Sequence, residues 1–340
     1  MRFENKIKLK VKNKNFIQND KSKQININTL NIILILILIL LIVILCLLII
    51  RTKRSNLDSN DSEENNLTIN SNNTFEPKII AITYSNMVFK YQAELNKKSA
   101  LEVGKVHEHY TFGPDDIDQE FKEKNKKILS KFRGGGYWLW KPYFILKTFK
   151  EKLREGDYII YADAGVLYMN STYLLIDFLK EQNAEMWMNR ILLKEASYSK
   201  RDAFILMGVD MPFYSETYQY IATFQIYRKS KYTEKFLEEL LFYSQDIRII
   251  SDYPNTLGIS NYPGFIENRH DQTVLSLLVK KYEEANSGNP SLSPNDINNG
   301  KHISMPNIFC IYRRIKFKDY DDLHEKCLNI IKRQTKIFSI

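Results

Sequence analysis

Asp163 is the residue of this 340-residue chain whose position most clearly suits chemistry. It follows the wholly apolar and aromatic run from Tyr158 to Tyr161, which is typical of a buried central strand. Open parallel sheets present ligand-binding groups at the carboxyl ends of their strands, and Gly165 would let the backbone turn close to a ligand. A carboxylate there is a natural ligand for Mg²⁺ or Mn²⁺, which prefer oxygen ligands. The competing interpretation is an exposed turn aspartate.

A second group of polar residues, 269–272 (RHDQ), opens a predicted helix whose leucines and valine are spaced for one buried side. Asp271 suits the N-cap of that helix, a structural role that competes with a catalytic one. Asp202, His270 and Asp271 are the candidates for a base that accepts a proton from a substrate hydroxyl.

Residues 133–142 (RGGGYWLWKP) combine three glycines, two tryptophans and a lysine. The spacing matches neither a P-loop nor a dinucleotide fingerprint. Pro142 suits the first turn of a helix that leads into the central strand, so Trp138 and Lys141 are expected near Asp163. Lys141, Lys200 and Arg201 are candidates to meet phosphate oxygens, with solvated surface cations as the alternative.

Alternating strands and helices must position these residues. Apolar runs predict strands, and apolar residues at helical spacing predict helices. The order predicts an α/β fold with a mostly parallel central sheet flanked by helices. The predicted strands are 78–83, 105–110, 158–161, 185–189, 223–227 and 303–312; the predicted helices are 91–101, one capped by Asp115 or Asp116, one from Pro142 that ends by Gly156, 171–181, 232–243, one opening at 269–272, and a basic C-terminal helix.

The first 76 residues divide into three segments of different composition. Residues 1–29 form a basic tail with eight Lys and Arg against two acids. Residues 30–50 include nineteen consecutive apolar residues, close to the ~20 that span a bilayer as a helix. Residues 51–76 are rich in Asn, Ser and Asp and predict a flexible stem, so the folded domain is predicted over 77–340.

The basic tail favours a cytosolic amino terminus and a single-pass type II orientation. The apolar segment is longer than a usual signal-peptide core and has no small-residue cleavage site, so we expect an uncleaved signal anchor. Glycosylation sequons at Asn60, Asn66, Asn72 and Asn170 agree with a lumenal stem and domain.

The net charge of +9 is mostly a property of the tail, which carries +6 and leaves 9 − 6 = +3 for residues 30–340. Basic residues in the folded part alternate with acids, which argues against a nucleic-acid groove. Cys46 lies in the apolar segment, so Cys310 and Cys327 are the cysteines of the domain. They could pair in an oxidising compartment, but their spacing does not decide it.

Four motifs follow one another in a specific order: GGGYWLWKPY, GDYIIYADAG, SKRDAF and NRHDQTVLSLLVKKY. With them the chain resembles, over about residues 78–312, a group of nucleotide-sugar glycosyltransferases of the GT-A fold. In that fold an Asp-x-Asp signature at the end of a central strand binds a divalent metal and the donor diphosphate. Asp163 is similar to the first aspartate, whereas Gly165 stands at the second. The resemblance therefore implies Mn²⁺ or Mg²⁺ at Asp163, and either another residue completes the site or the metal is bound weakly.

Glycogenin-like and bacterial galactosyltransferases place an Asp-Gln pair beside the reacting sugar, and Asp271 and Gln272 are similar in position. A late histidine ligates the metal in those relatives, which makes His302 a second candidate metal ligand. The resemblance leaves open whether the configuration of the sugar inverts or is retained.

The leading hypothesis is a type II membrane glycosyltransferase of the Golgi or endoplasmic reticulum with a lumenal catalytic domain. It would transfer a sugar from a nucleotide-sugar donor to a glycan or glycoprotein acceptor, with a divalent metal. The alternative, motivated by Gly165, is a catalytically inactive membrane-anchored protein that binds glycans or acts as a scaffold. A phosphate-ester hydrolase ranks below both, because no dense His/Asp cluster of metal-ligand spacing is present.

Overall fold

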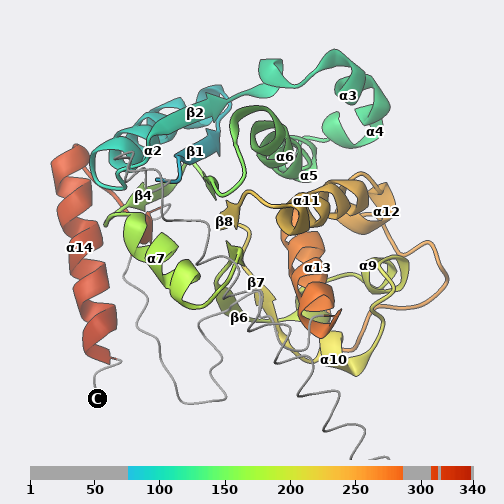
Figure 1. Ribbon diagram of the computed structural model, residues 1–340. Coiled ribbons are helices and arrows are strands. Elements are labelled where there is room, and N and C mark those ends of the chain that lie inside the picture. The colour runs from blue at the N-terminus through green and yellow to red at the C-terminus, as the bar shows by residue number, and fades with distance from the viewer. Residues whose placement is uncertain (1–75, 286–307, 313–314, 338–340) are drawn as a thin grey trace, which may run out of the picture. The chain divides into compact units, whose positions relative to one another are not determined.

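The computed structural model describes residues 76–285, 308–312 and 315–337 (Figure 1). The predicted basic tail, the predicted membrane span and all of the predicted stem except Glu76 lie outside these residues, as does His302. Among the described helices, none is both long enough and apolar enough to cross a membrane.

A five-stranded sheet forms the centre of the domain, in the order β2-β1-β3-β8-β5. β1 pairs in parallel with β2 and β3, whereas β8 is antiparallel to both β3 and β5. Four of the five strands therefore run in one direction, and the predicted mostly parallel α/β sheet is confirmed. The strands are β1 (Ile79–Tyr84), β2 (Glu108–Phe112), β3 (Tyr158–Ala162), β5 (Met186–Trp187) and β8 (Phe224–Arg228).

Two hydrophobic clusters cover the two faces of this sheet (Figure 1). Ile80 and Ile82 lie in one cluster with α6 (Trp140–Lys152), α11 (Lys231–Ser244) and α13 (Asp271–Ala285). Ile79 and Ala81 lie in the other with α2 (Lys90–Glu102) and α7 (Tyr173–Glu181). Because both faces are buried, β1 and β3 are continuous apolar runs in the sequence instead of alternating ones.

Two small antiparallel pairs flank the main sheet and were not predicted as pairs. β4 (Val166–Tyr168) pairs with β9 (Phe309–Ile311), and β6 (Arg190–Lys194) pairs with β7 (Tyr218–Tyr220). The predicted C-terminal helix is α14 (Tyr320–Ile337), which packs Leu323 and Cys327 against Leu167 of β4 and Cys310 of β9.

Short helices and turns complete the described chain. They are η1 (Met87–Phe89), η2 (Pro114–Asp116), α3 (Gln119–Lys124), α4 (Lys126–Leu129), α5 (Gly134–Tyr137), α8 (Glu195–Tyr198), α9 (Arg201–Leu206), α10 (Pro212–Ser215) and α12 (Ile247–Ile250).

Two predicted helix ends differ from the structure. Asp115 and Asp116 do not cap a helix but lie in the 3₁₀ turn η2, where the Asp116 carboxylate accepts from the Gly113 N–H at 2.7 Å. The helix expected after them is α3, which begins at Gln119 with Asp118 at its N-cap position, because Ile117 is extended, with ψ 126°. The helix expected from Pro142 is α6, which ends at Lys152 with the extended residue Leu153 as its C-cap, so Gly156 does not cap it. Gly156, with φ +88°, instead forms the turn into β3.

Candidate active site

The glycine motif forms a turn of the opposite hand to an α-helix. Residues 134–138 all have positive φ: 61°, 58°, 96°, 52° and 60°. At Gly135 and Gly136, ψ is 45° and 44°, the values of a left-handed helix. The N–H groups of Tyr137 and Trp138 bond carbonyls four residues earlier, at 2.8 and 3.3 Å. L-residues avoid this conformation, so three glycines in a row are a local requirement.

Neighbouring groups also restrict two of these glycines. A Cβ on Gly134 would lie 2.3 Å from the Trp138 ring, and one on Gly136 would lie 2.7 Å from the Leu129 backbone. At Gly135 the nearest atom would be 3.6 Å away, on Trp140. The turn is therefore closed at its two ends and roomier in the middle.

The turn leads directly into α6 and sets the direction of its first side chains. The Trp140 indole N–H donates to the Gly134 carbonyl at 2.9 Å, and its ring stacks on Tyr84 with centroids 3.7 Å apart. Lys141, the second residue of α6, is 3% exposed. Its Nζ lies 2.6 Å from Asp271 Oδ2, 3.4 Å from Asp163 Oδ1 and 3.1 Å from the Ala222 carbonyl oxygen. Residues of three motifs thus meet at the Lys141 ammonium group.

Asp163 directly follows β3, at the carboxyl end where a ligand site is expected. Its backbone N–H donates to the Thr223 carbonyl at 2.8 Å, which ties it to β8. Its Oδ1 accepts a hydrogen bond of 2.6 Å from the Tyr161 hydroxyl. The Asn96 amide of α2 donates to the Asp163 carbonyl at 3.4 Å. The carboxylate is held from its own strand while its side chain stays 14% exposed.

Asp271 is the first residue of α13. Burial raises the pKa of its carboxyl to about 6, the Lys141 ammonium opposes this shift, and the Asp163 charge adds to it. At neutral pH the group is an anion that accepts a proton more readily than an ordinary carboxylate. Gln272 accepts from the Ala222 N–H at 3.4 Å and donates to the Gln219 side chain at 2.7 Å, so it connects α13 to the start of β8.

His270, which precedes Asp271 and Gln272, packs against two aromatic rings. Its ring stacks on Trp138 with centroids 5.3 Å apart and contacts Tyr137 at 5.1 Å. Its Nδ1 is 3.1 Å from the Ile250 carbonyl oxygen, and its Nε2 is 3.6 Å from Asp252. Burial, the largest cause, lowers the pKa of the imidazole to about 4. His270 is thus neutral at pH 7 and joins the left-handed turn to the start of α13.

The remaining predicted residues, 200–202, lie at the start of α9 and contact the segment that follows α12. The Asp202 carboxylate accepts from the Thr256 N–H at 2.6 Å and from the Thr256 hydroxyl at 2.9 Å. Lys200 Nζ donates to the Tyr253 carbonyl, and burial lowers its pKa. Arg201 pairs with Asp210 at 2.8 Å and lies over the Tyr262 ring at 3.9 Å. The structure joins all three to this segment and gives no contact between them and Asp163.

The described donor groups do not fit a divalent metal in the arrangement shown. Among the described residues there is no group of three or more His, Cys, Asp or Glu side chains that could hold one. Asp163 and Asp271 come together, but the ammonium of Lys141 lies between them. Gly165 offers no side chain, and its carbonyl accepts from the Tyr312 N–H at 3.1 Å.

No family model and no curated protein matches the sequence. Solved structures that resemble the model include galactosyltransferase LgtC with donor and acceptor sugar analogues, at 12% identity and a TM-score of 0.40, over 74% of this chain and 94% of that one. Core-mannan synthase A from Aspergillus fumigatus, in its Mn/GDP form, is 10% identical with a TM-score of 0.35 over 62% and 72%. The bifunctional glycosyltransferase WbbM is 9% identical with a TM-score of 0.37 over 62% of this chain, which spans only 38% of WbbM.

Sequence reasoning missed several residues of the site. Tyr161 is part of the apolar strand and gave no polar signal, although its hydroxyl binds Asp163. Tyr84 lies just beyond the predicted strand 78–83 and was not a candidate, yet it stacks on Trp140. Burial, with the charges of Asp115 and Asp116, raises its pKa to about 12. Ala222 contributes through its backbone, which no side-chain pattern reveals.

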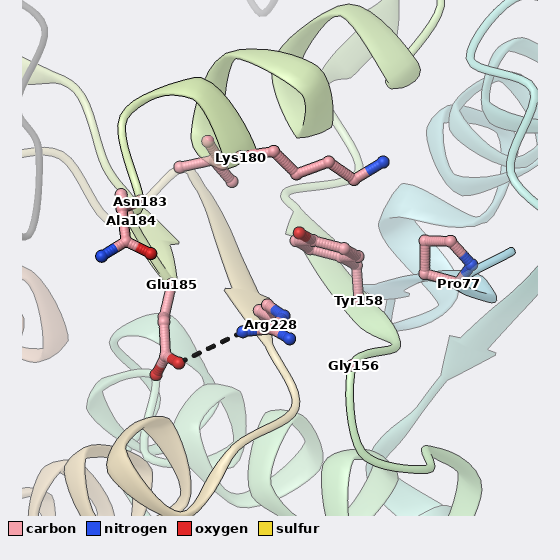
Figure 2. A pocket seen from close by; sticks show the side chains of 9 residues that line it. Pro77, Gly156, Tyr158, Lys180, Asn183, Ala184, Glu185 and Arg228 are labelled. Carbon is pink, nitrogen blue, oxygen red and sulfur yellow. Dashed lines mark hydrogen bonds and ion pairs between the residues drawn. The ribbon is translucent and has the colours of Figure 1, made fainter. Parts of the chain in front are cut away.

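A separate cavity of about 300 Å³ lies at the other end of β3 (Figure 2). Tyr158 and Arg228 line it, and Arg228 pairs with Glu185 at 3.4 Å. A larger space of about 970 Å³ is lined by residues of α4, α11 and α12. Neither cavity is lined by Asp163 or Asp271. We place the candidate active site at this carboxylate pair because Asp163, Asp271 and Lys141 meet there.

Proposed function

We propose that the protein is a glycosyltransferase that moves a sugar from a nucleotide-sugar donor to a hydroxyl group of a glycan or glycoprotein. The observation that carries the proposal is the convergence of Asp163, Asp271 and Lys141 at the carboxyl end of β3. These residues come from three of the four motifs through which the sequence resembles glycosyltransferases. Ligands of open α/β sheets bind at this edge.

Asp271 is the proposed base of an inverting transfer. The acceptor hydroxyl gives its proton to the Asp271 carboxylate as its oxygen bonds to the anomeric carbon. The bond between that carbon and the donor phosphate breaks, and its electron pair leaves with the nucleoside diphosphate. A base is most effective when its pKa lies close to the working pH, and the raised pKa of Asp271, about 6, meets that requirement.

Lys141 supplies positive charge in the same place. Its ammonium limits how far the pKa of Asp271 rises, so the carboxyl remains ionised at neutral pH. Asp163 is held by Tyr161 on the other side of the ammonium. In this proposal Asp163 and Lys141 position the base and the donor, and the aromatic stack of Tyr84 and Trp140 bounds the site.

The test uses the full chain in detergent with a panel of nucleotide sugars. Release of nucleoside diphosphate is measured in the presence and absence of Mn²⁺, with Asp271→Asn as the comparison variant. The proposal expects release from at least one donor by the natural chain and at least ~100-fold less by the variant. If no donor is hydrolysed and no nucleotide binds, the inactive glycan-binding alternative would replace it. The anomeric configuration of the product, read by NMR, separates inversion from retention.

We further propose the type II orientation, with the domain in the lumen of the Golgi or endoplasmic reticulum. The basic residues 1–29 and the sequons at Asn60, Asn66 and Asn72 support it. Expression in a glycosylating cell should give a mass shift that an endoglycosidase reverses. Digestion of the domain by protease added to intact microsomes would contradict this orientation.

A further inference from the structure

The cation at the carboxylate pair belongs to the protein itself. Among the described residues, oxygens of Asp271 at 2.6 Å, Ala222 at 3.1 Å and Asp163 at 3.4 Å lie around Lys141 Nζ. An ammonium group donates through its N–H groups and accepts nothing, and each of these oxygens can accept from it. The lysine is 3% exposed, and its ammonium also lies 5.0 Å from the centre of the Tyr161 ring.

The spacing of these oxygens suits nitrogen better than a metal ion. Mg²⁺ binds oxygens at about 2.0–2.1 Å. From the distances of 2.6 and 3.4 Å, a metal at the position of Nζ would need the carboxylates to move inward by about 2.6 − 2.1 = 0.5 Å and 3.4 − 2.1 = 1.3 Å. Asp163 is tied to β8 through its backbone, and Asp271 is fixed at the start of α13. The ammonium would also have to leave.

The backbone fixes Lys141 in this place. The left-handed turn of residues 134–138 ends three residues before it, and the Lys141 N–H donates to the Trp138 carbonyl at 2.9 Å. The neighbouring Trp140 is fixed by its indole bond to Gly134. The lysine therefore enters the site from a rigid start of α6 and not from a mobile loop.

We propose that Lys141 is the resident cation of the Asp163–Asp271 pair, that the free protein does not bind a divalent ion between these carboxylates, and that removing the ammonium creates a divalent-cation site there. The inference deepens the proposed function by naming the cation of its site. It concerns binding of a divalent ion in the absence of any donor. The inference can therefore fail while the proposed function stands, and the proposed function can fail while the inference stands.

The test is a Mn²⁺ titration of the metal-free full chain in detergent, followed by the EPR signal of free Mn²⁺. The variants are Lys141→Met, which keeps a long apolar stem, Asp163→Asn, and the two combined. We expect the natural chain and Asp163→Asn to titrate alike. Lys141→Met should bind Mn²⁺ at least ~10-fold more tightly than the natural chain, because a pair of neighbouring carboxylates that has lost the Lys141 ammonium favours a cation. The combined variant should lose that gain.

Two results would overturn the inference. One is Mn²⁺ binding by the natural chain that Asp163→Asn abolishes. The other is a folded Lys141→Met variant, judged by near-ultraviolet circular dichroism, that gains no Mn²⁺ binding. If Lys141→Met does not fold, Lys141→Gln replaces it, and the comparison of the natural chain with Asp163→Asn decides the first part alone.

Discussion

Lys141 and Asp271 form an ion pair of 2.6 Å although 129 residues separate them in the chain. The pair joins the start of α6 to the start of α13, two helices on the same face of the sheet. It follows that a change at Lys141 alters the pKa of Asp271, which the ammonium lowers.

The first prediction concerns the pH dependence of turnover. If Asp271 is the base, donor turnover with acceptor should fall about tenfold per pH unit below the pKa of about 6. Steady-state rates between pH 4.5 and 8 measure this. A rate that stays constant down to pH 4.5 in a folded protein would remove Asp271 from the role of base.

Replacing Lys141 should move the fall in turnover at acidic pH to a higher pH. The ammonium lowers the pKa of Asp271, so in Lys141→Met the pKa should rise and the fall in rate should begin at higher pH. The same pH–rate series on the variant is the measurement. Lys147→Met is a suitable control, because Lys147 lies on the same helix and pairs with Asp118 on the surface; its profile should match the natural one.

We expect the free energy of unfolding to fall as the pH falls, because the pKa of His270 is lower in the fold than in the unfolded chain. Its pKa is 6.5 in the unfolded chain and about 4 in the fold, so the unfolded chain takes up a proton first as the pH falls. Stability is complete above pH 6.5 and declines towards pH 4. The pKa difference of 6.5 − 4 = 2.5 corresponds to roughly 3 kcal/mol.

Urea unfolding of the natural chain and of His270→Asn between pH 7 and 4 tests this expectation. Asn tolerates the positive φ of 56° at this position. The variant should be less stable at pH 7, since it lacks the ring contacts, but its stability should depend less on pH. His109, whose pKa is also lowered to about 4, should keep part of the dependence in both proteins. Parallel curves for the two proteins would contradict the prediction.

The left-handed turn predicts unequal effects of two alanine substitutions. Gly135→Ala should cost about 1 kcal/mol, because its Cβ has room and only the positive φ is unfavourable. Gly136→Ala should cost at least ~3 kcal/mol, because its Cβ also meets the backbone of Leu129 at 2.7 Å. Chemical denaturation of both variants measures the difference. Equal losses would mean that the turn relaxes around residue 136.

Two aspartates at opposite ends of β3 should separate activity from stability. Asp157 is fully buried and accepts from the Lys78 and Arg154 N–H groups, both at 2.8 Å. Asp157→Asn should lower the free energy of unfolding by about 1–3 kcal/mol, because the two N–H groups bond to different oxygens of the carboxylate and an amide has a single oxygen. Asp163→Asn should lower turnover at least ~100-fold with little change in melting temperature. Activity losses that merely follow stability in both variants would place Asp163 outside the site.

The sequence allowed the central sheet to be predicted because its strands are locally distinctive. The runs IIAITY of β1 and YIIYA of β3 are apolar or aromatic apart from Thr83, and no helical spacing competes with them. The three-residue strands β4 and β9 could not be recognised as a pair, because each is too short to have a pattern and they are about 140 residues apart in the chain.

The sequence indicated which residues form the candidate site better than it indicated how they are arranged. Asp163, Lys141 and Asp271 were each singled out by residue type and by position relative to a helix or strand. Lys141 was expected to face phosphate oxygens, whereas the structure places it between two carboxylates. Such a contact depends on how α6 and α13 pack on the sheet, and no local pattern encodes that. The three glycines matched no known ligand-binding spacing, and in the structure they permit a turn of reversed hand.

That turn has a consequence for chirality. Over residues 134–138 the backbone takes the conformation that mirror-image amino acids adopt without strain. Glycine, being achiral, is the genetically encoded residue that serves both hands equally, and the chain uses it three times before Tyr137 and Trp138 follow. In a chemically synthesised domain, D-alanine at Gly135 would therefore match the handedness that the turn already has, where L-alanine opposes it.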